Sequence, residues 1–207
     1  MPKAENAQRG EVLTRTADRV RNLAEVFTGS REVNAMLDLV GDYSYNIDAR
    51  FLEPSCGNGN FLSEIYSRKL RTVSERSKDQ IEFEYLSIKA LTSIYGVDID
   101  PDNITEAKFR LLEIVIDHYS KKLNTGQRSQ NFDRAISKVL DTNIFVGDMI
   151  NGLSSIEFVE YSSIKPPKFS WRRYRYVDLL EAVTGSLWAD AADPIDEHRS
   201  INYWEIA

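Results

Sequence analysis

Residues 51–62 read FLEPSCGNGNFL, and this stretch decides the fold. Two apolar residues lead to an acidic residue and a proline, then to two glycines, and then to a helix-like apolar pattern. This is the layout of a strand that ends at a ligand and a helix that leaves it. Gly57 and Gly59 have no Cβ atom, so the backbone there can take a positive φ or approach a ligand closely. The amides that open the following helix favour negative charge at the same place.

Two further segments of this kind follow along the chain. Residues 95–101 read YGVDIDP, an apolar run that ends in acids, with a proline suited to the first turn of a helix. Residues 143–148 read NIFVGD and predict a third strand. Strands that alternate with helices form a parallel sheet, whose ligands lie beyond the carboxyl ends of the strands. The sequence therefore predicts an α/β, Rossmann-like fold with an abbreviated sheet and an N-terminal helical segment.

Glu53, Asp98 and Asp148 each stand where a predicted strand stops. Carboxylates accept hydrogen bonds from hydroxyl and amino groups, and an acid after the second strand commonly binds ribose hydroxyls. Ile99 could then cover one face of an adenine. The alternative for such an acid is a helix N-cap, which we favour for Asp100 because a proline follows it directly. For Asp98, which lies inside the apolar run, we favour the ligand.

Length and composition narrow the class of protein. A chain of 207 residues predicts one compact domain, and its net charge of −6 gives no general attraction to nucleic acid. With 2 histidines and a single cysteine, a zinc site of the usual type is not expected. Cys56 has no partner for an internal disulfide, and we interpret it as a packing residue of the loop. No apolar run approaches the roughly 20 residues of a membrane span, and the polar N-terminus lacks the apolar centre of a secretory signal, so we expect a cytoplasmic protein.

The chain divides into three predicted parts. Residues 1–45 form a helical segment, with helices over residues 11–26 and 30–40 and Ser30 as the N-cap of the second. Residues 46–165 form the α/β core, in which we expect residues 71–84 to be partly exposed, residues 121–134 to be loop and residues 135–140 to be a short helix. Residues 166–207 form a C-terminal extension that completes the sheet or contacts a partner. A strand is predicted over residues 156–161, and the chain beyond residue 185 is acidic and irregular up to residue 201.

Taken together, these segments resemble the N6-adenine DNA methyltransferases of restriction–modification systems, which have a class I fold dependent on S-adenosylmethionine (SAM). Residues 26–36, VFTGSREVNAM, look like the family's N-terminal motif, with Thr28 at its threonine and Gly29 where a proline is usual. Residues 53–61 match the glycine motif, residues 96–101 the ribose motif and residues 147–149 the adenine-amine motif, so the similarity covers about residues 20–150. The resemblance implies SAM as cofactor, bound by Phe27, Thr28, Glu53, Ser55, Gly57, Gly59, Asn60, Asp98, Ile99, Asp148 and Met149.

The family's catalytic loop, Asn/Asp-Pro-Pro-Tyr/Phe, is missing from this sequence. It supplies an acceptor for the adenine amine and an aromatic ring that stacks the extruded base. The nearest stretch is KPPKF at residues 165–169, where Lys165 has donors only and Phe169 comes one residue late. A proline pair between strands is most often a turn, so no catalytic residue is assigned. Three hypotheses stay open: a methyltransferase whose site is completed by another segment or chain, a SAM-binding module without catalysis, and a nicotinamide-dependent dehydrogenase, which the glycine spacing disfavours.

A basic and aromatic run, WRRYRY, occupies residues 171–176. Arg172, Arg173 and Arg175 could contact a DNA backbone while the aromatic rings stack bases. The alternative, which we prefer slightly, is an amphipathic strand with half-buried rings and solvated arginines. We therefore expect DNA to be reached through these arginines or through a partner subunit that supplies target recognition or catalysis, and we expect no membrane partner.

Overall fold

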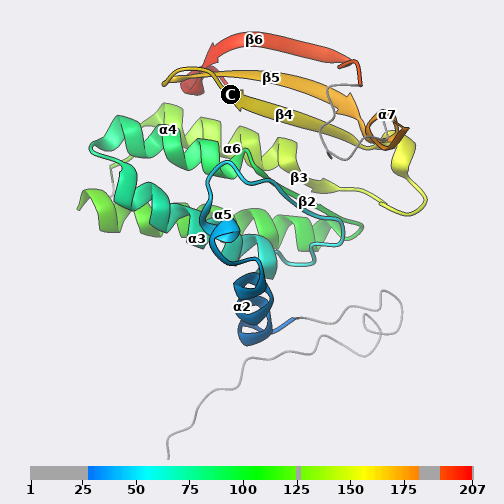
Figure 1. Ribbon diagram of the computed structural model, residues 1–207, viewed down its shortest axis with the longest axis horizontal. Helices are drawn as coiled ribbons and strands as arrows, with labels where there is room; N and C mark the ends of the chain where they lie inside the picture. Colours follow the sequence, from blue (N-terminus) through cyan, green and yellow to red (C-terminus); the bar gives the residue numbers. More distant parts are fainter. Residues whose placement is uncertain (1–27, 125–126, 182–191, 207) are drawn as a thin grey trace, which may run out of the picture.

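A computed structural model describes residues 28–124, 127–181 and 192–206 of the chain (Figure 1). The predicted helix over residues 11–26 and Phe27 lie outside these residues. The elements follow one another as α2 (Ser30–Leu39), η1 (Gly41–Tyr45), β1 (Phe51–Glu53), α3 (Asn60–Arg76), α4 (Gln80–Leu91), β2 (Ile94–Asp98), α5 (Pro101–Leu123), α6 (Gln130–Asn143), β3 (Ile144–Val146), η2 (Leu153–Ser155), β4 (Glu157–Ser163), β5 (Lys168–Arg175), α7 (Tyr176–Glu181), β6 (Asp196–Asn202) and η3 (Tyr203–Glu205).

Three strands form a parallel sheet in the order β1–β2–β3. Phe51 of β1 lies opposite Ile94 of β2, and Gly96 of β2 lies opposite Ile144 of β3. The central strand β2 is buried along its whole length. This explains its continuous apolar sequence, because a parallel sheet is covered on both faces. The predicted α/β class is confirmed, and the sheet with its helices is compatible with a Rossmann-like fold.

The two faces of the parallel sheet pack against different layers. Ile94 and Ile144 belong to a core cluster with the apolar sides of α3 and α5. Tyr95 and Val97 belong to a second cluster with Phe158 of β4. The rings of Tyr95 and Phe158 meet edge to face, with centroids 5.7 Å apart. Successive residues of β2 therefore serve two separate cores, because side chains alternate between the faces of a strand.

The C-terminal strands form a second, antiparallel sheet in the order β4–β5–β6. Within the described residues they pair only with one another, so residues 166–207 do not extend the parallel sheet. Instead, β6 lies in the stretch that we expected to be irregular. Figure 1 shows this sheet on one side of the molecule with α4 and α6 beneath it. The rings of Tyr85 in α4 and Phe169 in β5 are 4.9 Å apart, which places the second sheet directly on the helical layer.

Two helix starts differ in detail from the predictions. The N-cap of α2 is Gly29 and not Ser30, and no side chain caps that helix. The short helix predicted at residues 135–140 is longer, since α6 begins at Gln130. Ser129 is its N-cap, and its Oγ accepts a hydrogen bond from the Phe132 amide at 3.1 Å. A serine before an apolar-periodic run is a signal for a helix start that is visible in the sequence.

Helical structure also replaces much of the predicted loop. α5 continues to Leu123, so the predicted loop over residues 121–134 is largely helical. Residues 71–84 are partly exposed, as predicted, while Val73, Phe83 and Glu84 are buried because α3 and α4 pack against each other and against the core. No helix in the described part of the chain is long and apolar enough to cross a membrane.

Candidate functional site

The glycine loop lies between β1 and α3, at the carboxyl end of the parallel sheet. Gly57 and Gly59 both have left-handed backbone, with φ of 52° and 81°, a conformation that costs glycine little. A Cβ atom on Gly59 would lie 2.8 Å from the Cβ atom of Ala107 in α5, so this glycine also lets the two helices approach. The Cys56 amide donates to the Val97 carbonyl at 2.9 Å. The loop is thereby fixed to the end of β2.

Asp98 ends β2 and lies at the centre of the site. Its Oδ2 accepts a hydrogen bond from the Gly57 amide at 2.8 Å, and its Oδ1 accepts from the Asp100 amide at 2.9 Å and from Asn103 Nδ2 at 3.3 Å. The side chain is 6% exposed. A carboxylate accepts about four hydrogen bonds, so Asp98 can take one more donor or exchange the Gly57 amide for a ligand hydroxyl. Asp100 caps α5 through its side chain, which confirms the cap interpretation.

Asp148 follows β3 and closes a turn. Its carboxylate accepts hydrogen bonds from the Asn151 amide at 2.9 Å, from the Ile150 amide at 2.8 Å and from Asn151 Nδ2 at 3.2 Å. These bonds, with that of the Asn151 amide as the largest cause, lower the pKa of Asp148 below its usual value. The Gly147 amide donates to the Asp98 carbonyl at 2.9 Å. The turn that carries Asp148 is therefore joined to the end of β2.

Thr28 lies next to the start of α3. Asn60 Nδ2 donates to the Thr28 carbonyl at 3.0 Å, and Asn60 Oδ1 accepts from Arg110 at 2.7 Å. One side chain thus ties the segment before α2 to both α3 and α5. Hydrogen bonds therefore connect all four segments singled out in the sequence, from Thr28 through the glycine loop and the end of β2 to the turn after β3.

Glu53 and Cys56 have unusual environments beside the loop. Burial raises the pKa of the half-buried Glu53 carboxyl, and no donor among the described residues bonds to its carboxylate. Burial, together with the nearby charges of Asp98 and Glu53, raises the pKa of the Cys56 thiol to about 12. Cys56 is therefore protonated at neutral pH, which supports its role in packing and excludes a ready nucleophile.

Apolar side chains remain exposed at the same edge of the sheet. Ile99 after β2, Val146 at the end of β3 and Ile150 in the following turn are 58%, 51% and 84% exposed. Met149 is half-buried against the second core, and Ser55 is exposed in the glycine loop. Ligand sites commonly combine apolar side chains with a few converging polar groups, so this edge of the sheet is compatible with ligand binding.

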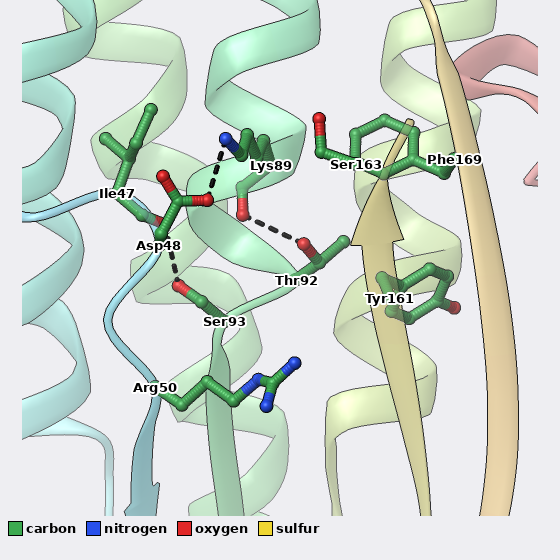
Figure 2. A pocket seen from close by; sticks show the side chains of 9 residues that line it. All are labelled: Ile47, Asp48, Arg50, Lys89, Thr92, Ser93, Tyr161, Ser163 and Phe169. Atoms are coloured by element: carbon green, nitrogen blue, oxygen red, sulfur yellow. Dashed lines mark hydrogen bonds and ion pairs between the residues drawn. The ribbon is translucent and has the colours of Figure 1, made fainter. Parts of the chain in front are cut away.

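The loop over residues 165–169 lies at the other end of the parallel sheet. Ser163 and Phe169 line a cavity of about 60 Å³ together with Arg50 and Ser93, the residues that precede β1 and β2 (Figure 2). Phe169 is buried, so its ring is not free to stack a base. The loop is a turn between β4 and β5 and does not reach the glycine loop, which excludes it as the missing catalytic loop.

The arginines of the basic run lie on β5. Its aromatic residues are half-buried or buried, as the amphipathic-strand interpretation predicts. Each arginine lies beside a carboxylate: Arg172–Glu197 at 3.6 Å, Arg173–Glu157 at 3.3 Å and Arg175–Asp178 at 2.8 Å. The positive charge of these three arginines is therefore locally balanced.

Sequence reasoning missed several side chains that support the site. Asn103 bonds to Asp98, and Arg110 bonds to both Asn60 and Glu106. Asn58 is buried in the glycine loop and donates to Glu106 at 3.2 Å. These side chains of α5 all lie in its first three turns. One indication of their role was visible in the sequence: a helix that starts just after Asp100 must begin at the same edge of the sheet as the site.

The comparisons with known proteins give one partial relative. A stretch of 73 residues is 32% identical to the adenine-specific methyltransferase PglX of Streptomyces coelicolor. This part of the chain is methyltransferase-like. The match covers 35% of the chain and 6% of the relative, so the chain spans a small fraction of that protein's length. No family model matches the chain, and no solved structure matches it significantly.

Proposed function

We propose that the chain has a class I methyltransferase fold and binds SAM at the carboxyl edge of the parallel sheet. The observation that carries this proposal is the hydrogen bond between the Gly57 amide and the Asp98 carboxylate. It joins a glycine loop to the acid after the second strand, where nucleotide-binding α/β folds hold a ribose. Asp98 would accept hydrogen bonds from the ribose hydroxyls and Asp148 one from the adenine amine, with Ile99 and Met149 covering the ring.

The methionine end of SAM fits the other side of the glycine loop. The Glu53 carboxylate is half-buried, has a raised pKa and meets no donor among the described residues, so a ligand ammonium is a favourable partner. α3 begins at Asn60 without a side-chain cap, which leaves its first amides for a carboxylate. Thr28, held beside Asn60, would close this end together with Ser55 and the two glycines.

SAM supplies an electrophilic methyl group when it is bound. We propose the N6 amine of adenine in DNA as the acceptor, within a restriction–modification system, because the partial relative is an adenine-specific methyltransferase. DNA would be reached through Arg172, Arg173 and Arg175 or through a partner subunit. Because carboxylates already balance these arginines, we favour the partner.

The second candidate function is a SAM-binding module without catalysis of its own. It is favoured by the position of the turn over residues 165–169, which lies at the amino end of the sheet with Phe169 buried. The chain would then act through association with another protein. Both functions need the same cofactor site, so they differ only in methyl transfer.

Calorimetric titration of the purified chain with SAM and, in parallel, with NAD tests the cofactor. We expect micromolar SAM binding and no NAD binding. Binding of NAD in place of SAM would favour the dehydrogenase, and binding of neither would sink the proposed site. Incubation with tritiated SAM and duplex DNA then separates the two candidates, since label on adenine rules out the module, whereas SAM binding without transfer supports it.

A further inference from the structure

One side of α5 lies against the glycine loop and the start of α3. Glu106, Ala107 and Arg110 share this side, because they are three or four residues apart along the helix. A Cβ atom on Gly59 would lie 2.8 Å from the Cβ atom of Ala107, so the loop and the helix are in direct contact there. This close approach brings Glu106 and Arg110 within hydrogen-bond distance of the residues on either side of Gly59.

Glu106 and Arg110, which we call the α5 pair, bond to each other and to two asparagines of the loop. Oε1 of Glu106 accepts from Arg110 Nε at 3.1 Å and from Asn58 Nδ2 at 3.2 Å. Nη1 of Arg110 donates to Asn60 Oδ1 at 2.7 Å. Asn58 and Asn60 flank Gly59 in the sequence. The α5 pair therefore fixes the loop on both sides of its second glycine.

The bond from Arg110 decides how the Asn60 side chain is oriented. A guanidinium group only donates hydrogen bonds, so the amide oxygen of Asn60 must face α5 and its amide nitrogen must face away. On that side, Asn60 Nδ2 donates to the Thr28 carbonyl at 3.0 Å. Without Arg110 the oxygen and the nitrogen could exchange places, and a carbonyl would then meet an oxygen. The α5 pair thus reaches Thr28 through Asn60.

We propose that the α5 pair makes the cofactor site selective for ligands that carry the amino-acid end of SAM. This inference rests on the proposed function, in which that end lies between Thr28 and the start of α3. Glu106 and Arg110 are positioning residues in this proposal. They act through Asn60, which holds Thr28 and the first turn of α3 in the arrangement that receives the carboxylate and the ammonium group.

Other groups fix the adenosine end of the site. Backbone amides donate to the carboxylate of Asp98 at the end of β2 and to that of Asp148 after β3. A change in the α5 pair should therefore weaken ligands that have an amino-acid end and spare ligands that lack one. A general loosening of α5 would weaken both kinds, because Asn103 at the start of this helix bonds to Asp98.

Calorimetric titration with two ligands tests the inference. S-adenosylhomocysteine has the amino-acid end, whereas 5′-methylthioadenosine has the same nucleoside without the carboxylate and the ammonium group. Arg110→Met keeps a long side chain with good helix propensity but removes the donor to Asn60. We expect this variant to bind S-adenosylhomocysteine about tenfold more weakly and 5′-methylthioadenosine less than about twofold more weakly. Lys108→Met, the matched control, removes from the same helix an ion pair with Asp141 at 2.7 Å and should leave both affinities unchanged.

Two substitutions of Glu106 separate its position from its charge. Glu106→Gln keeps an oxygen that can accept from Asn58 and Arg110, so its affinity for S-adenosylhomocysteine should stay within about threefold of the wild type. Glu106→Leu removes the acceptor and should lose about tenfold. An equal loss in both variants would mean that the carboxylate acts on the ligand by its charge, and it would overturn the positioning role.

The other outcomes are equally decisive. Equal losses of affinity for both ligands in Arg110→Met would make the α5 pair a purely structural contact, and an unchanged affinity for S-adenosylhomocysteine would remove its role altogether. A wild-type chain that binds both ligands equally well would show that the site does not select the amino-acid end. If the wild-type chain binds neither ligand, the proposed function itself fails, whereas failure of this inference leaves binding of S-adenosylhomocysteine by the wild-type chain intact.

Discussion

Two carboxylates are buried in the described part of the chain, and they differ in the groups that donate hydrogen bonds to them. Asp98 lies at the sheet edge and Glu84 in the helical layer, with 6% and 1% of their surface exposed. The donors to Asp98 come from the glycine loop and from the start of α5, directly beside it. Glu84 accepts from hydroxyl groups of three other elements at 2.7–3.2 Å: Tyr119 in α5, Ser129 before α6 and Tyr203 in η3. Gln80 Nε2 of its own helix also donates, at 3.0 Å.

The difference shows that burial alone does not identify a ligand-binding acid. A ligand hydroxyl can replace the Gly57 amide at Asp98, because the loop lies at the open edge of the sheet. The hydroxyl groups that donate to Glu84 lie within the helical layer, so a ligand hydroxyl cannot take their place. Burial, with the Glu84 carboxylate as the next cause, raises the pKa of Tyr119 to about 12, so this hydroxyl stays a donor at neutral pH. Asp98 therefore stays our proposed ligand-binding acid, whereas Glu84 holds the helices together.

The largest effect on stability is expected for Glu84→Ala. It removes the acceptor of the Ser129 and Tyr203 hydroxyl groups and leaves Tyr119 only the Gln127 carbonyl at 3.3 Å, and each unsatisfied buried group costs about 1–3 kcal/mol. We expect the free energy of unfolding, measured by urea titration, to fall by about 4 kcal/mol. Glu113→Ala, at an exposed position of α5, is the control and should change it by less than about 0.5 kcal/mol. A loss below about 1 kcal/mol for Glu84→Ala would contradict its structural role.

Asp98→Ala should have the largest effect on the ligand. Loss of charge-assisted hydrogen bonds to two hydroxyls costs about 3 kcal/mol, so SAM affinity measured by calorimetry should fall about 100-fold. Asp100→Ala is the matched control two residues away. It removes the cap of α5 and costs about 1 kcal/mol of stability, but it should leave SAM affinity nearly unchanged. Equal losses of affinity in both variants would mean that the ribose is not bound at Asp98.

The buried amine of Lys69 extends the comparison, because it forms no ion pair with any carboxylate of the described residues. Its Nζ donates to the Ala49 carbonyl and to Ser93 Oγ beside the cavity of Figure 2. Burial lowers its pKa from 10.5 to about 7. Between these values the unfolded chain binds the proton and the folded chain releases it, so stability rises with pH in this window and not below it. We expect the free energy of unfolding to rise by about 2 kcal/mol from pH 7 to about pH 9.

The Lys69→Met variant should be more stable than the wild type at pH 7, and its free energy of unfolding should rise much less between pH 7 and about pH 9. Lys89→Met, which removes a partly exposed ion pair with Asp48, should keep it. Urea unfolding at a series of pH values measures both variants. If the wild type and Lys69→Met show the same slope, the amine of Lys69 is not held in the neutral form that its burial favours.

The difference between local contacts, as at Asp98, and contacts between distant elements, as at Glu84, also explains how much of the fold could be predicted from the sequence. The ends of β1, β2 and β3 carry local signals: Glu53 ends β1 before the glycine loop, Asp98 ends β2 before the helix cap Asp100, and Gly147 and Asp148 follow β3. In the second sheet, local patterns indicated β4 and β5 but not β6. The residues of β6 are mostly exposed and read DEHRSIN, and they form a strand because they pair with β5. Pairing between distant segments is tertiary and leaves no trace in a local pattern.

The sequence predicted which segments form the candidate site, but not which side chains contact one another there. The sequence placed Asp98 and Asp148 in equivalent positions, whereas the structure gives them different surroundings. Asn103 reaches Asp98 and Arg110 reaches Asn60 because α5 starts at the same edge of the sheet. The carboxylate Glu197 beside Arg172 comes from β6, an element that the sequence did not reveal. Such partners depend on packing between helices and sheets.

Asp148→Asn is expected to have the smallest effect on SAM affinity. Comparing it with Asp98→Ala shows which of the two acids contributes more to binding. The amide oxygen of asparagine can still accept from the Ile150 and Asn151 amides, so the turn and the thermal unfolding midpoint should persist. The charge-assisted bond to the adenine amine is weakened, and SAM affinity should fall about tenfold. Backbone amides lower the pKa of Asp148, so the carboxylate stays ionised and its contribution should be constant from about pH 5 to about pH 8. A loss equal to that of Asp98→Ala would mean that the exposed acid, and not the buried one, carries the binding energy.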